Sequence, residues 1–425
     1  MHLHLTRRSV WLIGLVAVIL TALWGSLSLE IIGLLAQYQG NAESEAGRPA
    51  LLAGAPNGPV PGPRHPSPGS SGPWGRIEYR SFSLEPPDEF VTVPRARTPE
   101  LAWHFEDFTT QELRDFFARL ELTDAQREHL LAPRRWTVAE ESITVRPAAE
   151  MVWSLPLEAR QTICAELANS PANLTYHLPF TRQRQNVATW FQRSELRPET
   201  VELVRALTYT VGNSVCFADV DMVLNKIQDP AESRRLLKTL WRQEALLMTL
   251  RIEPGDDLRA LQAYWSHGPH ARNSRALLES QANSPLGGDV DVVHLLPPMP
   301  RRLLNTFAFP ASTGTGMEHN CYWTAMNFFA QTPDDQCFDL QHARSRLDAE
   351  FFPVADEPRF GDVILVARAD GRIIHAANYI ADDVVFTKNG GQFRRPWVLM
   401  KMDEMLAIYP SNLPLKLYAF RRKET

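Results

Sequence analysis

Cysteine and excess positive charge are both scarce in this sequence. The four cysteines, Cys164, Cys216, Cys321 and Cys337, are spread over 425 residues without a CxxC pair. This excludes a disulfide framework and the common zinc motifs. The formal net charge is -5, which argues against nucleic acid as a partner. No internal repeat is visible, and we expect no cofactor and no bound metal.

Hydrophobic residues are plentiful, at 44% of a chain long enough for more than one domain. Arg7 and Arg8 precede an uncharged apolar run, SVWLIGLVAVILTALWGSLSL, from Ser9 to Leu29. A helix needs about 20 such residues to cross a bilayer, and the run lacks the small-residue cleavage site of a secretory signal. We therefore expect residues 1–38 to form a signal anchor, a single transmembrane helix. The flanking arginines keep the N-terminus inside the cell, so later domains lie outside the cytoplasm. A cleaved signal peptide and a buried helix are the alternatives.

The next segment is dominated by proline, glycine, serine and alanine. It reads QGNAESEAGRPALLAGAPNGPVPGPRHPSPGSSGPWG and covers residues 39–75. Such a composition cannot bury enough apolar surface to offset the chain entropy of folding. We expect a disordered tether that holds the folded part away from the membrane.

Residues 76–294 show mainly helical patterns. Apolar residues at Leu113, Phe116, Phe117 and Leu120 follow the spacing of one helix face. The stretch DPAESRRLLKTLWRQEALLMTL, residues 229–250, begins with Asp229 as an N-cap and a proline in the first turn, and we expect it to be helical. We therefore predict an all-α module with a possible protein partner. Its cysteines, Cys164 and Cys216, are expected to be buried, with a disulfide between them as the alternative.

The pattern changes after about residue 295, where short strands separated by turns prevail. FGDVILVA, IIHAANYI, VVFTKNG, PWVLMKM and PLKLYAFRR are strand candidates, with a short helix near residues 403–408. One helix that carries a cysteine, followed by an antiparallel meander, is typical of an α+β domain.

Chemistry is expected at Cys321, which follows the loop ASTGTGME in the stretch HNCYWTAMNFF. The start of a helix lowers a thiol pKa and presents N–H groups to an oxyanion. His375, in a strand, can serve as the base. Thr387 and Asn389 share a face of the next strand and can orient the imidazole.

Three alternatives for Cys321 need no nucleophile. The cysteine can be an inert buried residue, or it can form a disulfide with Cys337. It can also belong to a zinc site with His319, Cys337 and His342, although their spacing follows no common zinc pattern.

The order of these motifs resembles the NlpC-type peptidases, papain-like cysteine enzymes that cut peptide bonds in bacterial cell-wall peptidoglycan. The likeness runs through NCYWTAMNFF, FGDVILVA and HAANYIADDVVFTKNG, within residues 295–425. It implies a papain-like fold for this domain. Cys321 would be the nucleophile, His375 the general base, and Asn389 or Thr387 the residue that orients it. The chain departs from the family at Tyr322-Trp323, where members carry Ser-Gly.

We therefore expect an α+β protein of the bacterial inner membrane, made of an anchor and linker, a helical module and an extracytoplasmic papain-like domain. Its predicted function is hydrolysis of an amide bond, in peptidoglycan stem peptides or another peptide substrate, by Cys321 and His375. The main alternative is a catalytically inactive papain-like scaffold or cell-envelope binding protein, which the bulky Tyr322-Trp323 pair favours. A lipid-handling acyltransferase is a third possibility.

Overall fold

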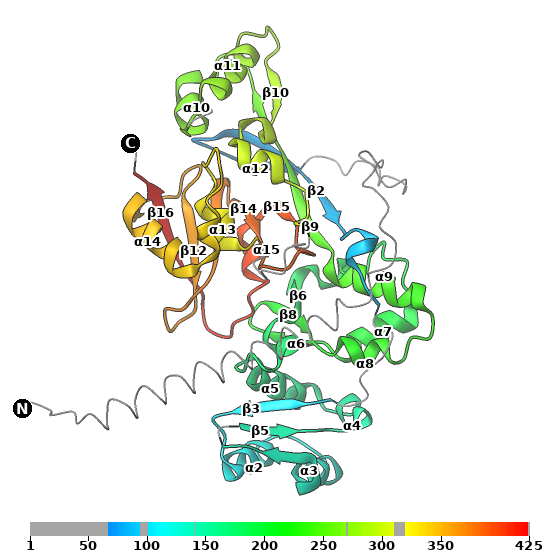
Figure 1. Ribbon diagram of the computed structural model, residues 1–425. Helices are drawn as coiled ribbons and strands as arrows, with labels where there is room; N and C mark the ends of the chain where they lie inside the picture. The colour runs from blue at the N-terminus through cyan, green and yellow to red at the C-terminus, as the bar shows by residue number, and fades with distance from the viewer. Residues whose placement is uncertain (1–66, 94–100, 141, 269–270, 310–318, 424–425) are drawn as a thin grey trace, which may run out of the picture. The chain divides into compact units, whose positions relative to one another are not determined.

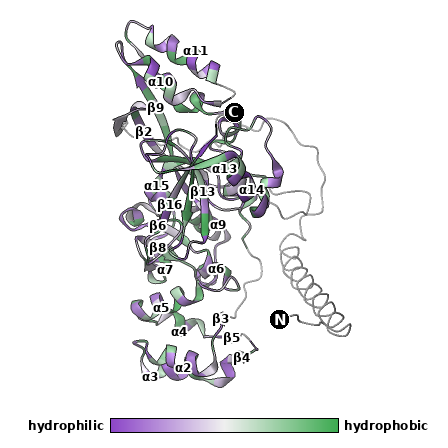
Figure 2. Ribbon diagram, turned by 90° about the vertical axis from the view of Figure 1, so that its left-hand side faces the viewer, coloured by the Kyte–Doolittle hydropathy of each residue, from purple (hydrophilic) through white to green (hydrophobic). Residues whose placement is uncertain are grey.

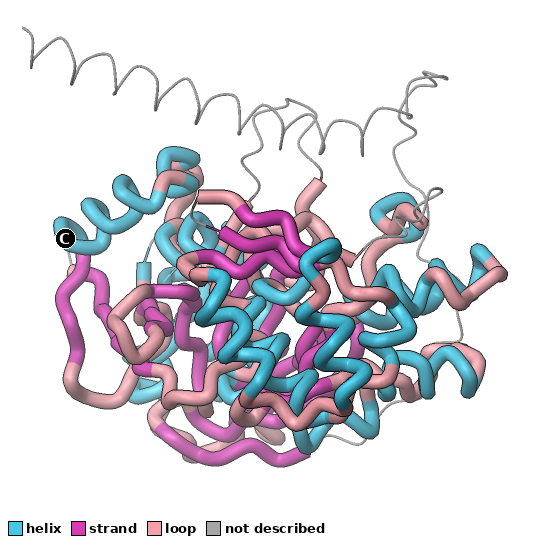
Figure 3. The backbone as a smooth tube through the Cα atoms, turned by 90° about the horizontal axis from the view of Figure 1, so that it is seen from below, coloured by secondary structure: helices cyan, strands magenta, loops and turns pink. Residues whose placement is uncertain are grey.

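The computed structural model describes residues 67–93, 101–140, 142–268, 271–309 and 319–423 (Figure 1). All of them belong to one compact unit of the chain, residues 63–425. Helices and antiparallel sheets are mixed through it (Figure 3), as expected for an α+β protein. The expected anchor helix and most of the expected linker lie outside the described residues. Within the described residues, no helix combines the length and the apolar character needed to cross a membrane.

The first sheet joins two distant parts of the chain. Its order is β1-β2-β9-β10, and the strands are β1 (Ser67–Gly72), β2 (Gly75–Leu84), β9 (Gln243–Ile252) and β10 (Gly288–Asp291). The long strands β2 and β9 run side by side (Figure 1), paired from Arg76↔Arg251 to Leu84↔Gln243. The end of the expected linker is therefore a strand, which corrects its predicted boundary at residue 75.

The helix expected over residues 229–250 is half helix and half strand. Asp229 caps α9 (Pro230–Trp241) by accepting a hydrogen bond from the Ala231 N–H, as predicted. The chain then becomes extended at Arg242 and continues as β9. Leu246, Met248, Leu250 and Ile252 are all buried, which is the period of a strand. The helical prediction was wrong here because the run ALLMTL fits either pattern, and pairing with β2 decides between them.

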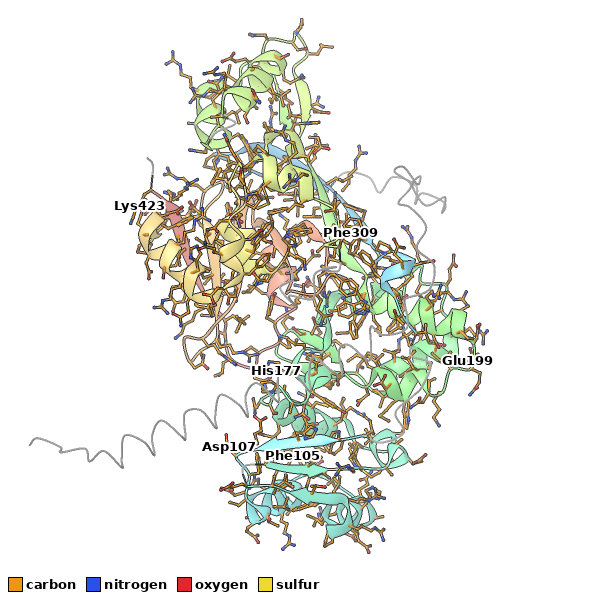
Figure 4. All side chains as sticks on the ribbon, in the orientation of Figure 1. Phe105, Asp107, His177, Glu199, Phe309 and Lys423 are labelled. Carbon is orange, nitrogen blue, oxygen red and sulfur yellow. The ribbon has the colours of Figure 1, made fainter. Side chains whose placement is uncertain are left out.

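The module between β2 and β9 contains two small sheets, so the all-α prediction was wrong. One has the order β3-β5-β4, and the other has the order β6-β8-β7. Figure 4 labels Phe105, a buried residue of β3 that lies against Phe117 of α2. The strands are β3 (Trp103–Glu106), β4 (Trp136–Val138), β5 (Ser142–Val145), β6 (Phe180–Gln183), β7 (Tyr209–Val211) and β8 (Ser214–Phe217).

The helices of this module confirm much of the predicted pattern. The apolar face at Leu113, Phe116 and Phe117 is buried in α2, which begins with a Thr109 capping box. Together with the strands, these helices enclose one hydrophobic core that extends from Trp103 to Leu240. The helices are α2 (Thr110–Ala118), α3 (Asp124–Leu131), α4 (Ala149–Trp153), α5 (Leu157–Leu167), α6 (Leu174–His177), α7 (Pro198–Ala206) and α8 (Val220–Leu224).

The C-terminal sheet agrees with the predicted meander. Its order is β11-β16-β12-β13-β14-β15, and all of its neighbours are antiparallel. Its central strands are strongly hydrophobic (Figure 2). The strands are β11 (Phe351–Val354), β12 (Val363–Ala367), β13 (Ile373–Ala381), β14 (Val384–Lys388), β15 (Trp397–Lys401) and β16 (Lys416–Arg422).

A second large core shows that the described chain does not divide at residue 294. Residues of β2, β9 and the helices after β9 share this core with the C-terminal sheet, from Ile77 to Leu399. A smaller cluster, which includes Ala245 of β9, lies on the other face of that sheet. The remaining helices are α10 (Leu258–Trp265), α11 (Ala271–Ala282), α12 (Pro298–Leu303), α13 (Cys321–Met326), α14 (Leu340–Glu350) and α15 (Met402–Leu406). The module from β3 to α9 is thus inserted into the domain that contains the candidate site.

Candidate active site

Cys321 opens a helix, as the sequence predicts. Asn320 has extended backbone angles and caps α13, because its side-chain oxygen accepts a hydrogen bond from the Trp323 N–H at 2.9 Å. The helix is only six residues long and ends at Met326, which is shorter than the expected continuation through TAMNFFA. The loop after β14 lies close by, since a Cβ added to Gly391 would be 3.9 Å from the Asn320 Cβ.

Two hydrogen bonds hold α13 against the C-terminal sheet. Asn378 of β13 donates to the Ala325 carbonyl at 3.1 Å, and the Trp397 indole of β15 donates to the Thr324 hydroxyl at 2.9 Å. All four residues are buried, so these bonds are shielded from water and fix the helix in place. The sulfur of Cys321 consequently lies beside the backbone of β13.

His375 is held at both ring nitrogens. Its Nε2 lies 2.8 Å from the Thr387 Oγ1 on the neighbouring strand β14. Its Nδ1 lies 2.7 Å from the hydroxyl of Tyr409, whose ring stacks on the imidazole at 4.7 Å between centroids. A neutral imidazole has one N–H and one bare nitrogen, so it donates to one hydroxyl and accepts from the other.

The structure distinguishes the two candidates for the orienting residue. Thr387 contacts the His375 ring, whereas Asn389 lies beyond the end of β14 and donates to the Met400 sulfur at 3.2 Å. The side-chain oxygen of Asn389 is buried and has no hydrogen-bond partner. The period-two argument placed both residues on one face, but it requires a strand, and the strand stops at Lys388.

Cys321 and His375 belong to elements in contact, α13 and β13, but their side chains are not bonded to each other. Strand register pairs His375 with Val366, whose side chain belongs to the smaller cluster, while the helix of Cys321 packs through Trp323 and Ala325 on the opposite face of the sheet. Among the described residues, no hydrogen bond joins the Cys321 sulfur to the imidazole. Tyr409 occupies the ring nitrogen that Thr387 leaves open.

Burial makes both groups neutral at pH 7. Cys321 is 5% exposed, and desolvation raises its thiol pKa to about 11. The N–H groups of Ala376, Tyr322 and Cys321 itself, and the charge of Lys388, act in the opposite direction. Burial lowers the pKa of His375 to about 3. This arrangement contains a thiol and a neutral imidazole, not a thiolate–imidazolium pair.

Two residues of this site were not found from the sequence. Tyr409 follows α15, and no sequence spacing relates it to His375. Lys388 is fully buried, donates to the carbonyls of Gly390 and Gln392 at 3.1 and 2.7 Å, and lies over the Trp397 ring. A lysine next to Asn-Gly-Gly reads as an exposed turn residue, so its burial could not be predicted.

Of the alternatives for the cysteines, the disulfides and the zinc site are not supported, whereas the buried residue is. All four cysteines are buried and free. The proposed zinc set is split, because the ring of His319 contacts Trp323, Phe338 and Trp397 instead.

A different cluster brings together Asp334, Cys337 and His342, with ligand atoms within 4.8 Å of one another. Arg346 already lies in that cluster, 3.4 Å from the Cys337 sulfur and 3.7 Å from the Asp334 carboxylate. Its guanidinium supplies the positive charge that a metal would bring.

Comparison with known proteins adds no relative. No protein-family model, no curated protein and no solved structure matches the chain. The likeness to NlpC-type peptidases therefore rests on the quoted motifs, with the His375–Thr387 pair and the position of Cys321 at a helix start as the geometry to be tested.

Proposed function

We propose that this protein is a cysteine hydrolase that cleaves an amide bond, with Cys321 as nucleophile, His375 as base and Thr387 as the residue that orients the base. The observation that carries the proposal is the 2.8 Å contact between the His375 Nε2 and the Thr387 Oγ1, on the strand next to the helix start of Cys321. A base held from behind by a third polar group is the arrangement that nucleophilic catalysis requires. The peptide substrate in the bacterial cell wall and the membrane anchor are proposed from the motifs alone.

Tyr409 makes the described arrangement a resting state. Its hydroxyl fills the Nδ1 position of His375, which must instead accept the proton of the Cys321 thiol. The productive arrangement requires Tyr409 to move away and the Cys321 sulfur to meet the imidazole at the edge of the sheet. The proton then passes to Nδ1, and the thiolate attacks the carbonyl carbon of the substrate. N–H groups at the start of α13 then stabilise the oxyanion. His375 protonates the leaving amine, and water hydrolyses the thioester.

The segment that carries Tyr409 is fastened to the inserted module. Ser214 donates to the Ala407 carbonyl at 2.8 Å, and Gln183 donates to the Asp403 carboxylate at 2.9 Å. The Gly212 N–H donates to the Asn412 side chain at 3.2 Å. These bonds flank Tyr409 on both sides, so the inserted module stabilises the closed position.

A second candidate function is a non-catalytic scaffold or envelope-binding protein. It is favoured by the occupation of both His375 nitrogens and by the raised thiol pKa of Cys321. In this alternative the closed arrangement of Tyr409 is permanent and Cys321 is only a buried residue.

Alkylation of the full-length protein in detergent separates the two candidates. Iodoacetamide labelling across pH, read by mass spectrometry, is compared for wild type, Tyr409→Phe and the double variant Tyr409→Phe/His375→Ala. For a hydrolase we expect the Tyr409→Phe variant to label Cys321 at least tenfold faster at pH 7, with release of amine from peptidoglycan fragments. Both effects should disappear without His375. Equal and slow labelling of Cys321 in all three proteins, without cleavage, would establish the scaffold.

A further inference from the structure

Two arginines without acidic partners meet where the inserted module joins the long strand β9. Arg182 lies on β6, and one of its amino groups donates to the carbonyl of Arg242. Arg395 lies just before β15 and donates to the Gln243 side chain at 3.3 Å. Because Arg242 and Gln243 are adjacent, both guanidinium groups converge on one turn of the chain.

The hydrogen-bond partners of these guanidinium groups are all neutral. Arg182 donates to the carbonyls of Thr181 and Arg242, and Arg395 donates to one amide oxygen. Within the described residues, no carboxylate lies within ion-pair distance of either one. The contrast is Arg242, which is as buried as Arg395 but forms a salt bridge with Glu85; Arg182 is half-buried. An unpaired buried charge is costly, and a bound anion would supply the missing partner.

Each guanidinium group is positioned by an indole. Arg182 lies 5.0 Å from the centre of the Trp190 ring, and Arg395 lies 5.1 Å from that of Trp241. Stacking on a ring fixes the plane of a guanidinium and leaves its edge available for two parallel hydrogen bonds. Arg395 has five N–H donors and uses one of them on the Gln243 side chain, although it is only 8% exposed.

The local charge balance favours an anion. Burial, followed by the charge of Arg395, lowers the pKa of Arg182 to about 9, and burial lowers the pKa of Arg395 to about 10. Both therefore stay protonated at pH 7. Of the carboxylates that act on Arg182, Glu404 has its pKa raised to about 7 by burial, and Glu244 accepts a hydrogen bond from Ser83 at 2.6 Å. Their charges partly offset that of Arg182, but within the described residues neither carboxylate lies within ion-pair distance of it.

We propose that Arg182 and Arg395 form a binding site for an oxyanion, a carboxylate or phosphate group of a small ligand, held by bidentate hydrogen bonds between the two stacked guanidinium groups. This site borders the proposed hydrolase centre, because the charge of Arg395 acts on Tyr409, but anion binding does not depend on the chemistry of that centre. Charge-assisted bidentate bonds are the strongest of the ordinary hydrogen bonds, and both planes are already oriented.

The test uses full-length protein in detergent at pH 7, with sodium phosphate, sodium succinate and sodium chloride as probes at equal ionic strength. Isothermal titration and thermal unfolding are measured for wild type, Arg182→Gln, Arg395→Gln and Arg395→Lys. The control is Arg251→Gln, an exposed arginine that pairs with Asp289. We expect phosphate or succinate, but not chloride, to bind and raise the unfolding temperature. Tighter binding of phosphate or of succinate shows whether the site prefers a phosphate or a carboxylate group.

Each glutamine variant should weaken binding at least tenfold, Arg395→Lys should weaken it less, and Arg251→Gln should leave it unchanged. Circular dichroism verifies that each variant is folded. The proposal is overturned if chloride gives the same response as both oxyanions. It is also overturned if folded Arg182→Gln and Arg395→Gln proteins bind like the wild type.

Discussion

The inserted module and the C-terminal sheet reach similar burial by different means. The module surrounds two three-stranded sheets with short helices, and its core comes from one continuous stretch of the chain, from Trp103 to Leu240. The C-terminal sheet draws its core from residues as distant as Ile77 and Leu399. Local contacts form at a lower cost in loop entropy than distant ones. We infer that the module is the more autonomous of the two regions and that the candidate site depends on the less autonomous one.

The largest expected effect tests whether the two cores unfold separately. Phe117 is fully buried in the core of the inserted module, and Phe386 is fully buried in the core of the C-terminal sheet. Phe117→Ala and Phe386→Ala should each cost about 3–5 kcal/mol of unfolding free energy. In urea unfolding followed by tryptophan fluorescence and circular dichroism, each variant should shift a different transition. A common shift of a single transition would mean that the regions unfold together.

The next effect concerns the hydrogen bond that distinguishes the two orienting candidates. Thr387→Val keeps the shape of the side chain but leaves the buried His375 Nε2 without its partner. This should cost about 1–3 kcal/mol. Asn389→Ala is the matched control, because its only described side-chain bond goes to a thioether sulfur, a weak acceptor. If Thr387→Val and Asn389→Ala lose the same unfolding free energy in chemical denaturation, Thr387 is not the residue that orients His375.

The largest contribution of a single histidine to the pH dependence of stability should come from the C-terminal region. Burial lowers the folded-state pKa of His375 from 6.5 to about 3, so the unfolded chain binds more protons between these values. The contribution of the neutral ring is fully present above pH 6.5 and is lost as the pH falls. Between pH 6.5 and pH 5 the loss is about 2 kcal/mol. Urea unfolding of wild type and His375→Gln at both pH values measures it, and an identical pH dependence in the two proteins would refute the assignment.

The smallest expected effect lies in the module. Asp229 caps α9 through the Ala231 N–H, and Asp229→Ala should cost about 1 kcal/mol, while Asp229→Ser should be nearly neutral. The loss of unfolding free energy should appear in the unfolding transition of the inserted module, and the alkylation rate of Cys321 should not change. A change in the alkylation rate of Cys321 would show that the inserted module affects the candidate site by contacts other than those of the segment around Tyr409.

The sequence was most informative where local chemistry is strong. The strands of the C-terminal meander, the α2 face at Leu113 and Phe117, and the Asp229 cap all follow their predictions. It was least informative for short apolar runs such as ALLMTL, which fit a helix or a strand until a partner is known. The small strands of the module were missed for the same reason, since each has only three or four residues.

Sequence alone determined that Cys321 opens a helix and that His375 and Thr387 occupy neighbouring strands, because caps, turns and period-two alternation act over a few residues. Only the tertiary structure decided which atoms meet the imidazole. Tyr409 reaches His375 from 34 residues away, and β9 finds β2 across the whole inserted module. The local sequence pattern does not predict the pKa values of Cys321 and His375, because desolvation depends on every element that packs around a group. It also does not predict that Arg182 lies near Arg395.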